Sequence, residues 1–156
     1  MAKFDAAERG RKAEELFTEE YNCAQSVFCA YAEECGLELG TAAKIASTFG
    51  GGMGRMREVC GAVTGALMVM GLLRGYDDPK EQDSKAALYE QVQEFGRRFR
   101  EANGSIICRE LLAAAEADAS AGGAPEARTA AYYHARPCAR LVRSGAELLA
   151  QMLNEE

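Results

Sequence analysis

The stretch from Gly50 to Gly75 constrains the fold of this chain more than any other, because a glycine cluster and a strongly apolar run meet in it. It opens with three consecutive glycines, and a fourth stands at Gly54. Glycine loses more conformational freedom on folding than any other residue, so such a cluster is costly inside a regular helix or strand. An apolar run rich in small residues follows, from Val59 to Leu73. The stretch therefore predicts a glycine loop that leads into a buried helix.

The apolar run predicts a helix of the protein core rather than a membrane span. It has about 15 residues, whereas a spanning helix needs about 20, and arginines stand near both of its ends. The first twenty residues are charged throughout and lack the apolar stretch of a signal peptide. We therefore expect a cytoplasmic protein without membrane insertion.

The composition favours helices over a sheet. The chain has three prolines, no tryptophan and many alanines, and alanine is the strongest helix former. Its 156 residues are most simply one domain, residues 1–156, which is long enough to bury a core. The net charge of −6 argues against a nucleic-acid partner, because phosphates need a basic surface. We expect an all-α bundle of six or seven helices around the buried central helix.

Capping and breaking residues predict where these helices begin and end. The expected helices cover residues 3–18, 23–35, 42–49, 59–73 and 79–102, with one more after Ser105 and a last one from Pro137. Asn22, Thr41 and Ser105 are the expected N-caps. Ala119–Pro125, rich in glycine and alanine, is expected to be a flexible surface link. Gly61 and Gly65 lie one helical turn apart and predict close approach of a neighbouring backbone.

Six cysteines are present, and in a reducing compartment permanent structural disulfides are unusual. They are therefore more simply catalytic, redox-sensing, metal-binding or buried residues. No CxxC and no CxxCH sequence occurs, which excludes a CxxC-type redox motif and a covalently attached haem.

Four of the six cysteines fall in or near the predicted first turns of helices: Cys23, Cys60, Cys108 and Cys138. Unpaired N–H groups and the positive end of the helix macrodipole stabilise an anion there. A thiolate is thus favoured over a thiol, and both nucleophilic attack and metal ligation need the thiolate. Arginines stand beside three of the four in the sequence. We interpret the four as a candidate functional set.

The other two cysteines lie in different surroundings. Cys29 falls in the middle of a predicted helix, which is typical of a small buried hydrophobe. Cys35 follows two glutamates at the end of that helix, where the field disfavours a thiolate. His134, the only histidine, is most simply a surface residue.

Cys23, the sequence Cys60-Gly61-Ala62-x-x-Gly65, Cys108 and Cys138 together resemble the C_GCAxxG_C_C family of redox-active proteins. The resemblance covers residues 20–141. It implies a small helical protein with four characteristic cysteines and a redox role, but no particular reaction. A similar domain occurs in haem proteins of the split-Soret cytochrome type. This chain lacks a haem attachment motif, so the haem role does not transfer.

The first hypothesis is a thiol-dependent oxidoreductase that serves an unidentified thiol or electron-transfer partner. Cys60 would be the attacking thiolate, its pKa lowered by the helix end and by Arg55 and Arg57. Cys23, Cys108 or Cys138 would then resolve the mixed disulfide. The sequence leaves open whether the protein forms a homodimer.

Two other hypotheses stay open. The four thiolates of Cys23, Cys60, Cys108 and Cys138 can be ligands for zinc or an iron–sulfur cluster, although metal sites usually include one closely spaced ligand pair. Alternatively the chain is a binding module whose glycine loop and two arginines hold an anion. More simply, Arg55 and Arg57 are solvated or paired with Glu58.

Overall fold

The computed structural model describes residues 3–155, and within them the chain is helical without a strand. The all-α prediction is confirmed. The elements are α1 (Ala6–Thr18), α2 (Cys23–Cys29), α3 (Leu39–Ala46), the 3-10 turn η1 (Ser47–Phe49), α4 (Gly50–Met53), α5 (Gly61–Arg74), α6 (Gln82–Asn103), α7 (Cys108–Ala114), α8 (Ala130–Ala135) and α9 (Cys138–Asn154). None of the helices in this described part is long and apolar enough to cross a membrane.

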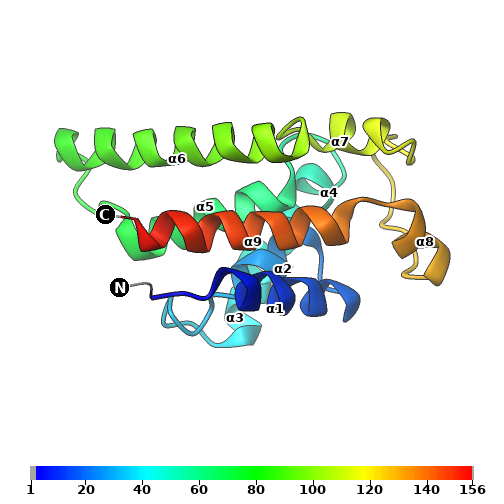
Figure 1. Ribbon diagram of the computed structural model, residues 1–156, viewed down its shortest axis with the longest axis horizontal. Coiled ribbons are helices and arrows are strands. Elements are labelled where there is room, and N and C mark those ends of the chain that lie inside the picture. The colour runs from blue at the N-terminus through cyan, green and yellow to red at the C-terminus, as the bar shows by residue number, and fades with distance from the viewer. Residues whose placement is uncertain (1–2, 156) are drawn as a thin grey trace.

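Helix α9 is the element that the others surround. It packs against α1, α2, α5 and α6. In Figure 1 the long helix α6 lies along one side of α9 and α1 lies along the other, with α2 and α5 behind. The two ends of the described chain lie at one end of the molecule, and the short helix α8 lies at the opposite end.

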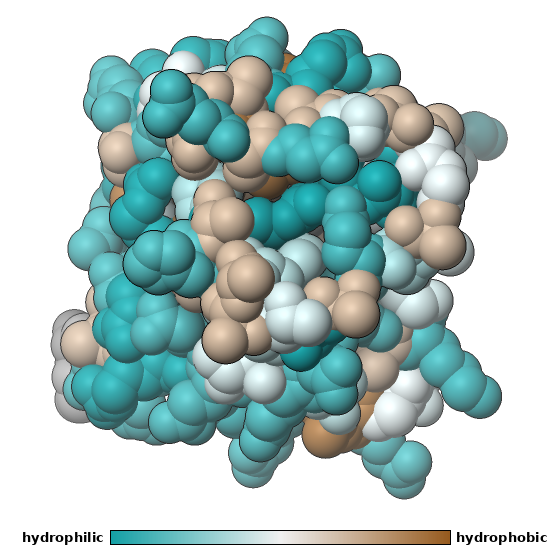
Figure 2. Space-filling model, turned by 90° about the vertical axis from the view of Figure 1, so that its right-hand side faces the viewer, coloured by the Kyte–Doolittle hydropathy of each residue, from teal (hydrophilic) through white to brown (hydrophobic). Residues whose placement is uncertain are grey.

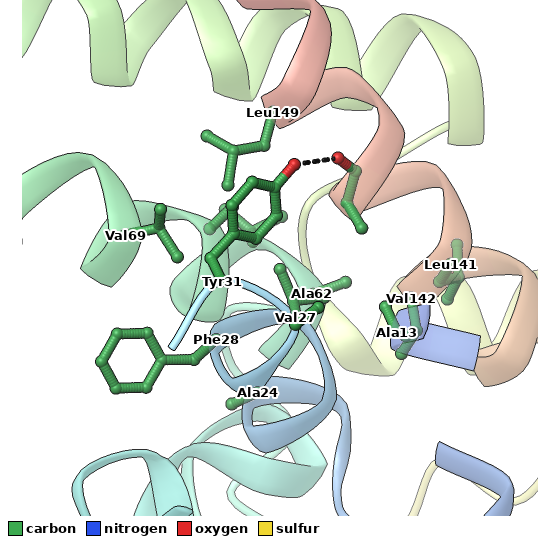
Figure 3. Close-up of a cluster of buried hydrophobic side chains, with 14 of the residues drawn as sticks. Ala13, Ala24, Val27, Phe28, Tyr31, Ala62, Val69, Leu141, Val142 and Leu149 are labelled. Atoms are coloured by element: carbon green, nitrogen blue, oxygen red, sulfur yellow. Dashed lines mark hydrogen bonds between the residues drawn. The ribbon is translucent and has the colours of Figure 1, made fainter. Parts of the chain in front are cut away.

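The predicted central helix, α5, is indeed buried between α2 and α9. Its inward residues include Ala62, Ala66 and Val69, all fully buried. Figure 3 shows Val69 beside the aromatic rings of Phe28 and Tyr31 in one continuous apolar cluster. The core thus joins segments from both halves of the chain.

Glycines allow α5 to lie this close to its neighbours, as the sequence predicts for Gly61 and Gly65. A Cβ atom on Gly61 would lie 2.7 Å from the Ala24 nitrogen, and one on Gly65 would lie 2.6 Å from the Ala24 oxygen. On the other side, a Cβ on Gly145 of α9 would lie 2.9 Å from the Ala62 oxygen. The Gly-Ala-x-x-Gly sequence is therefore a packing device that brings three helices together.

The glycine cluster forms a left-handed turn. Residues 51–55 all have positive φ angles, between 61° and 69°, and the Gly54 N–H donates to the Gly50 oxygen. A left-handed helical conformation costs about 1–2 kcal/mol per non-glycine residue. Glycine at three of these five positions therefore lowers the conformational energy of the turn. Gly52 is also sterically required, because its Cβ would lie 2.6 Å from the Cys108 Cβ.

The predicted N-cap Asn22 is confirmed. Its side chain accepts from the Gln25 N–H at 2.8 Å, and the Gln25 side chain accepts from the Asn22 N–H. However, the helix that follows ends at Cys29 rather than at residue 35. The chain continues to Gly36 in turns, because N–H groups such as that of Tyr31 bond three residues back instead of four.

Other boundaries differ for local reasons. Helix α3 begins at Leu39, after Glu38 rather than Thr41. Helix α6 begins at Gln82 because a turn at Asp78 precedes it, with the Glu81 N–H donating to the Asp78 oxygen. Helix α7 begins at Cys108, since the Ser105 hydroxyl accepts from the Ile107 N–H and so does not cap it. Helix α8 was not predicted.

Candidate thiol site

All four candidate cysteines, Cys23, Cys60, Cys108 and Cys138, line one cavity of about 580 Å³. Cys29 and Cys35 do not line it. All six cysteines lie within the described residues, and each is a free thiol. The structure thus brings together the set that the sequence selected.

Each of the four stands where a helix begins. Cys23, Cys108 and Cys138 are the first residues of α2, α7 and α9, and Cys60 is the N-cap of α5. The cysteines point to one cavity because these four helix starts converge. The long helix α9 directs its unpaired N–H groups and positive dipole end towards Cys138.

Backbone pairing fixes Cys60 beside the start of α7. The Cys60 N–H donates to the Ile106 oxygen at 2.8 Å, and the Cys108 N–H donates to the Glu58 oxygen at 2.6 Å. An isolated antiparallel bridge joins Val59 to Ile107 between them. The segments before α5 and α7 therefore run side by side, which places two cysteines far apart in sequence at one cavity wall.

Four arginines also line the cavity: Arg55, Arg57, Arg128 and Arg136. The Arg57 side chain is only 3% exposed. Its Nη1 donates to the Cys108 sulfur at 3.7 Å, and its Nε donates to the Ser120 oxygen at 3.0 Å. A buried guanidinium group thus touches one of the four sulfur atoms.

The expectation that Arg55 and Arg57 are solvated or paired with Glu58 is wrong, because both side chains are largely buried. Glu58 pairs with Arg109 at 3.1 Å. Arg55 and Arg57 instead face Glu126, with Nη-to-Oε1 distances of 2.6 Å and 3.7 Å. The reason is the fold: the chain after α7 returns to the glycine turn and carries Glu126 to its arginines.

This returning segment, residues 115–129, is hydrogen-bonded to the glycine turn, whereas the sequence predicted a flexible link over Ala119–Pro125. The Gly122 N–H donates to the Arg55 oxygen at 2.9 Å, and Arg55 Nε donates back to the Gly122 oxygen at 2.8 Å. With the bond from Arg57 to Ser120, three hydrogen bonds tie it to the glycine turn. Figure 2 views the end of the molecule near α8, where strongly hydrophilic residues run between hydrophobic ones.

Sequence reasoning missed two functional candidates on this segment, Glu126 and Arg128. Glu126 provides the carboxylate that three arginines share, and Arg128 lies over the Phe17 ring at 4.4 Å while lining the cavity. The only sequence signal was that two charged residues follow the run of small residues Ala119–Pro125.

Cys138 carries the most acidic thiol of the site. A hydrogen bond with Cys23 is the largest effect that lowers its pKa, and the cations Arg136, Arg128 and Arg57 add to it. Together they outweigh burial and bring the pKa of Cys138 to about 7. The same hydrogen bond, with burial, raises the pKa of Cys23 well above its usual value. Of the pair, Cys138 is therefore the thiol that ionises near neutral pH, and Cys23 keeps its proton.

The expected lowering of the Cys60 pKa is wrong. Cys60 is 4% exposed, and burial raises the pKa of its thiol to about 12, outweighing backbone hydrogen bonds that favour the thiolate. Burial also raises the pKa of Cys108, with partial compensation from the Arg57 hydrogen bond. A position at a helix start is thus insufficient to acidify a thiol that the core surrounds.

The donor set of four thiols is chemically suited to zinc or iron, but its arrangement does not fit. Among residues 3–155, no group of three or more His, Cys, Asp or Glu side chains is placed to hold a metal ion.

Comparison with known proteins assigns the chain to a family. Residues 21–152 match the family described as "Putative redox-active protein (C_GCAxxG_C_C)". The chain belongs to the C_GCAxxG_C_C family. An uncharacterized protein of Archaeoglobus fulgidus is 32% identical over 116 residues, which cover 69% of this chain and 76% of that protein. The resemblance inferred from the four cysteines is confirmed.

A solved structure shares the fold of this C_GCAxxG_C_C protein. It is the split-Soret cytochrome c from Desulfovibrio desulfuricans, described as having a novel iron centre. The TM-score is 0.68 at 17% identity, and the match covers 97% of this chain and 69% of the cytochrome chain. At this identity the match shows a common helical architecture.

Proposed function

We propose that this C_GCAxxG_C_C protein is a dithiol redox protein in which Cys138 attacks a disulfide and Cys23 resolves the product. One observation carries the proposal: Cys23 and Cys138 line the same cavity, where Cys23, Arg136 and Arg128 lower the pKa of Cys138 to about 7. A thiol of that pKa is substantially ionised at neutral pH while keeping good nucleophilicity. The family description as redox-active supports the same chemistry.

The reaction proceeds in two exchanges. The Cys138 thiolate attacks one sulfur of a substrate disulfide, the S–S bond breaks, and one substrate half leaves as a thiolate. Cys23 then gives its proton to the departing substrate thiolate, and the Cys23 thiolate attacks the Cys138 sulfur in the mixed disulfide, which releases the second half as a thiolate. The protein dithiol is oxidised to a disulfide and the substrate is reduced by two electrons. An external thiol reductant regenerates the dithiol by the reverse exchanges.

Cys60 and Cys108 face the same cavity, but their raised pKa values keep them protonated at neutral pH. We propose that they take part only after the first pair is oxidised. Of the two, Cys108 is better prepared for exchange, because Arg57 Nη1 can stabilise its thiolate.

Cysteine variants test the assignment. Cys138→Ser is expected to lower the rate of reduction of a small disulfide by roughly 100-fold or more, because the thiolate nucleophile is removed. Cys23→Ser keeps a hydroxyl donor for the Cys138 thiolate but removes the resolving sulfur. It should therefore accumulate a mixed disulfide on Cys138, detectable by intact-protein mass spectrometry.

Cys29→Ser is the matched control, because Cys29 is buried outside the cavity with a pKa raised to about 11. It should react like the unaltered protein. Cys60→Ser should still form the mixed disulfide, in contrast to the expectation from sequence. Full activity of Cys138→Ser would disprove the proposal.

The metal content of the purified protein tests the metal hypothesis. Elemental analysis of protein purified without oxygen should give zinc and iron far below one atom per chain. A stoichiometric metal that is lost in Cys23→Ser and Cys138→Ser would replace the dithiol proposal with a thiolate metal centre.

A further inference from the structure

The cavity lining contains more cationic side chains than one thiolate needs for its stabilisation. Four guanidinium groups line it, from Arg55, Arg57, Arg128 and Arg136, against the two carboxylates of Glu20 and Glu126. Burying this many cations beside one thiolate is costly unless further anions approach them. The lining therefore favours an anionic ligand.

Arg57 provides the most direct indication. Its Nη2 atom is buried and has no hydrogen-bond partner in the described structure. The nearest carboxylate oxygen, Glu126 Oε1, is 3.7 Å away, too far for a hydrogen bond. A buried cationic donor without an acceptor is rare in folded proteins. Since Arg57 lines the cavity, a ligand oxygen entering there can supply the missing acceptor.

Glu126 shows that these arginines bind a carboxylate. Its Oε1 lies 2.6 Å from Arg55 Nη1 and 2.7 Å from Arg136 Nη2. The arginines keep the pKa of Glu126 below its usual value although burial opposes this. Glu126 is paired by charge with Arg55 and Arg136, yet neither Arg55 Nη1 nor Arg57 Nη2 has a hydrogen-bond partner, so the cluster has capacity for a second anion.

The size of the cavity and the burial of the sulfurs restrict the ligand to a small molecule. Cys138 is only 8% exposed and Cys60 only 4%. A disulfide on a protein surface cannot reach such a sulfur without displacing part of the cavity wall. A volume of about 580 Å³ lies within the range of small-ligand pockets.

We infer that the substrate of the thiol pair is a low-molecular-weight disulfide that bears carboxylates. One carboxylate binds at Arg57 Nη2, with Arg136 beside it, and this places the disulfide next to the Cys138 sulfur. The inference rests on the proposed function, since it names the substrate class of the same site. The bonds formed and broken are those of the two exchanges above.

Three small disulfides of similar size but different charge test the inference: dithiodipropionate (anionic), hydroxyethyl disulfide (neutral) and cystamine (cationic). The rate constant for oxidation of the reduced protein is measured with each. The rate constant for the anionic disulfide should be about 10-fold higher than that for the neutral one, because the anionic disulfide gains a charge-assisted hydrogen bond. Cystamine should be the slowest.

Arginine variants locate the effect. Arg57→Gln and Arg136→Gln should each lower the anionic-to-neutral rate ratio towards one, while Arg57→Lys should retain part of the preference. Each ratio is taken within one variant, so a changed Cys138 pKa or a partial loss of folded protein affects both rates equally. Arg97→Gln is the control, because Arg97 is exposed on α6 and does not line the cavity.

The outcomes separate this inference from the function on which it rests. Equal rates with all three disulfides, or a ratio unchanged in both Arg57→Gln and Arg136→Gln, would overturn the anion site and leave the dithiol function standing. If none of the three disulfides oxidises the protein, the proposed function itself fails.

Discussion

At the residue scale, the properties of Cys138 come from several neighbours acting on one sulfur atom. Cys23 donates a hydrogen bond, and three arginines contribute positive charge. Burial acts against them, as it does at Cys60, where it prevails. The two cysteines stand at similar helix starts, so their different pKa values show that neighbouring side chains decide thiol acidity here.

The pH dependence of alkylation tests this difference. A thiolate is the reactive form, so the rate at Cys138 should rise as the pH increases through about 7 and level off above it. An unperturbed cysteine would not level off until about pH 8.5. The measurement is the iodoacetamide rate at Cys138, followed by peptide mass spectrometry from about pH 5 to about pH 10, a range that includes both midpoints.

Cys23→Ala provides the comparison for this profile. It removes the donor that contributes most to the lowered pKa, so the midpoint at Cys138 should move to higher pH. An identical midpoint in Cys23→Ala would show that the hydrogen bond does not control the thiol.

At the element scale, α5 depends on glycine at the face that meets α2 and not elsewhere. Gly65 and Gly71 belong to the same helix, but only Gly65 faces a neighbouring backbone. A Cβ at Gly65 would lie 2.6 Å from the Ala24 oxygen, whereas a Cβ at Gly71 would have no atom within 4 Å. The two glycines therefore form a matched pair for substitution.

Gly65→Ala is expected to destabilise the protein by about 1–3 kcal/mol, because backbone atoms cannot give way without shifting a helix. Gly71→Ala is expected to stabilise it by about 0.5–1 kcal/mol, because alanine loses less conformational freedom in a helix. Urea unfolding measured by circular dichroism gives both free energies. Similar effects at the two positions would contradict the packing role of Gly65.

At the scale of the whole molecule, Tyr31 joins two segments that are distant in sequence. Its hydroxyl donates to the Ala146 oxygen of α9 at 2.8 Å inside the core, as Figure 3 shows. The ring is fully buried and packs beside Leu149 and Val69. This bond fixes the chain after α2 relative to α9, and both α2 and α9 deliver a cysteine to the thiol site.

Tyr31→Phe is expected to lower the free energy of unfolding by about 1 kcal/mol, the usual net value of a buried hydrogen bond. Urea unfolding measures this loss. Tyr89→Phe is the control, because Tyr89 is exposed on α6 and its substitution should change stability little. If Tyr31→Phe were as stable as the unaltered protein, the bond would not help to orient α2 and α9.

Much of the fold could be predicted because its signals are local. Asn22 caps α2 through residues three positions away, and small residues mark the buried helix α5. Boundaries such as that of α7 were missed by a few residues, because Ser105 forms a different local hydrogen bond. The path of residues 115–129 depends on distant contacts with Arg55 and Arg57.

The sequence by itself determined the helical class, the family and the four cysteines, since propensity, capping and residue identity are carried by short stretches of chain. Only the tertiary structure decided which thiol is acidic. That choice follows from burial at Cys60 and from Cys23, Arg136 and Arg128 around Cys138. Electrostatic and desolvation effects depend on distances in space, and residues far apart in the sequence set those distances.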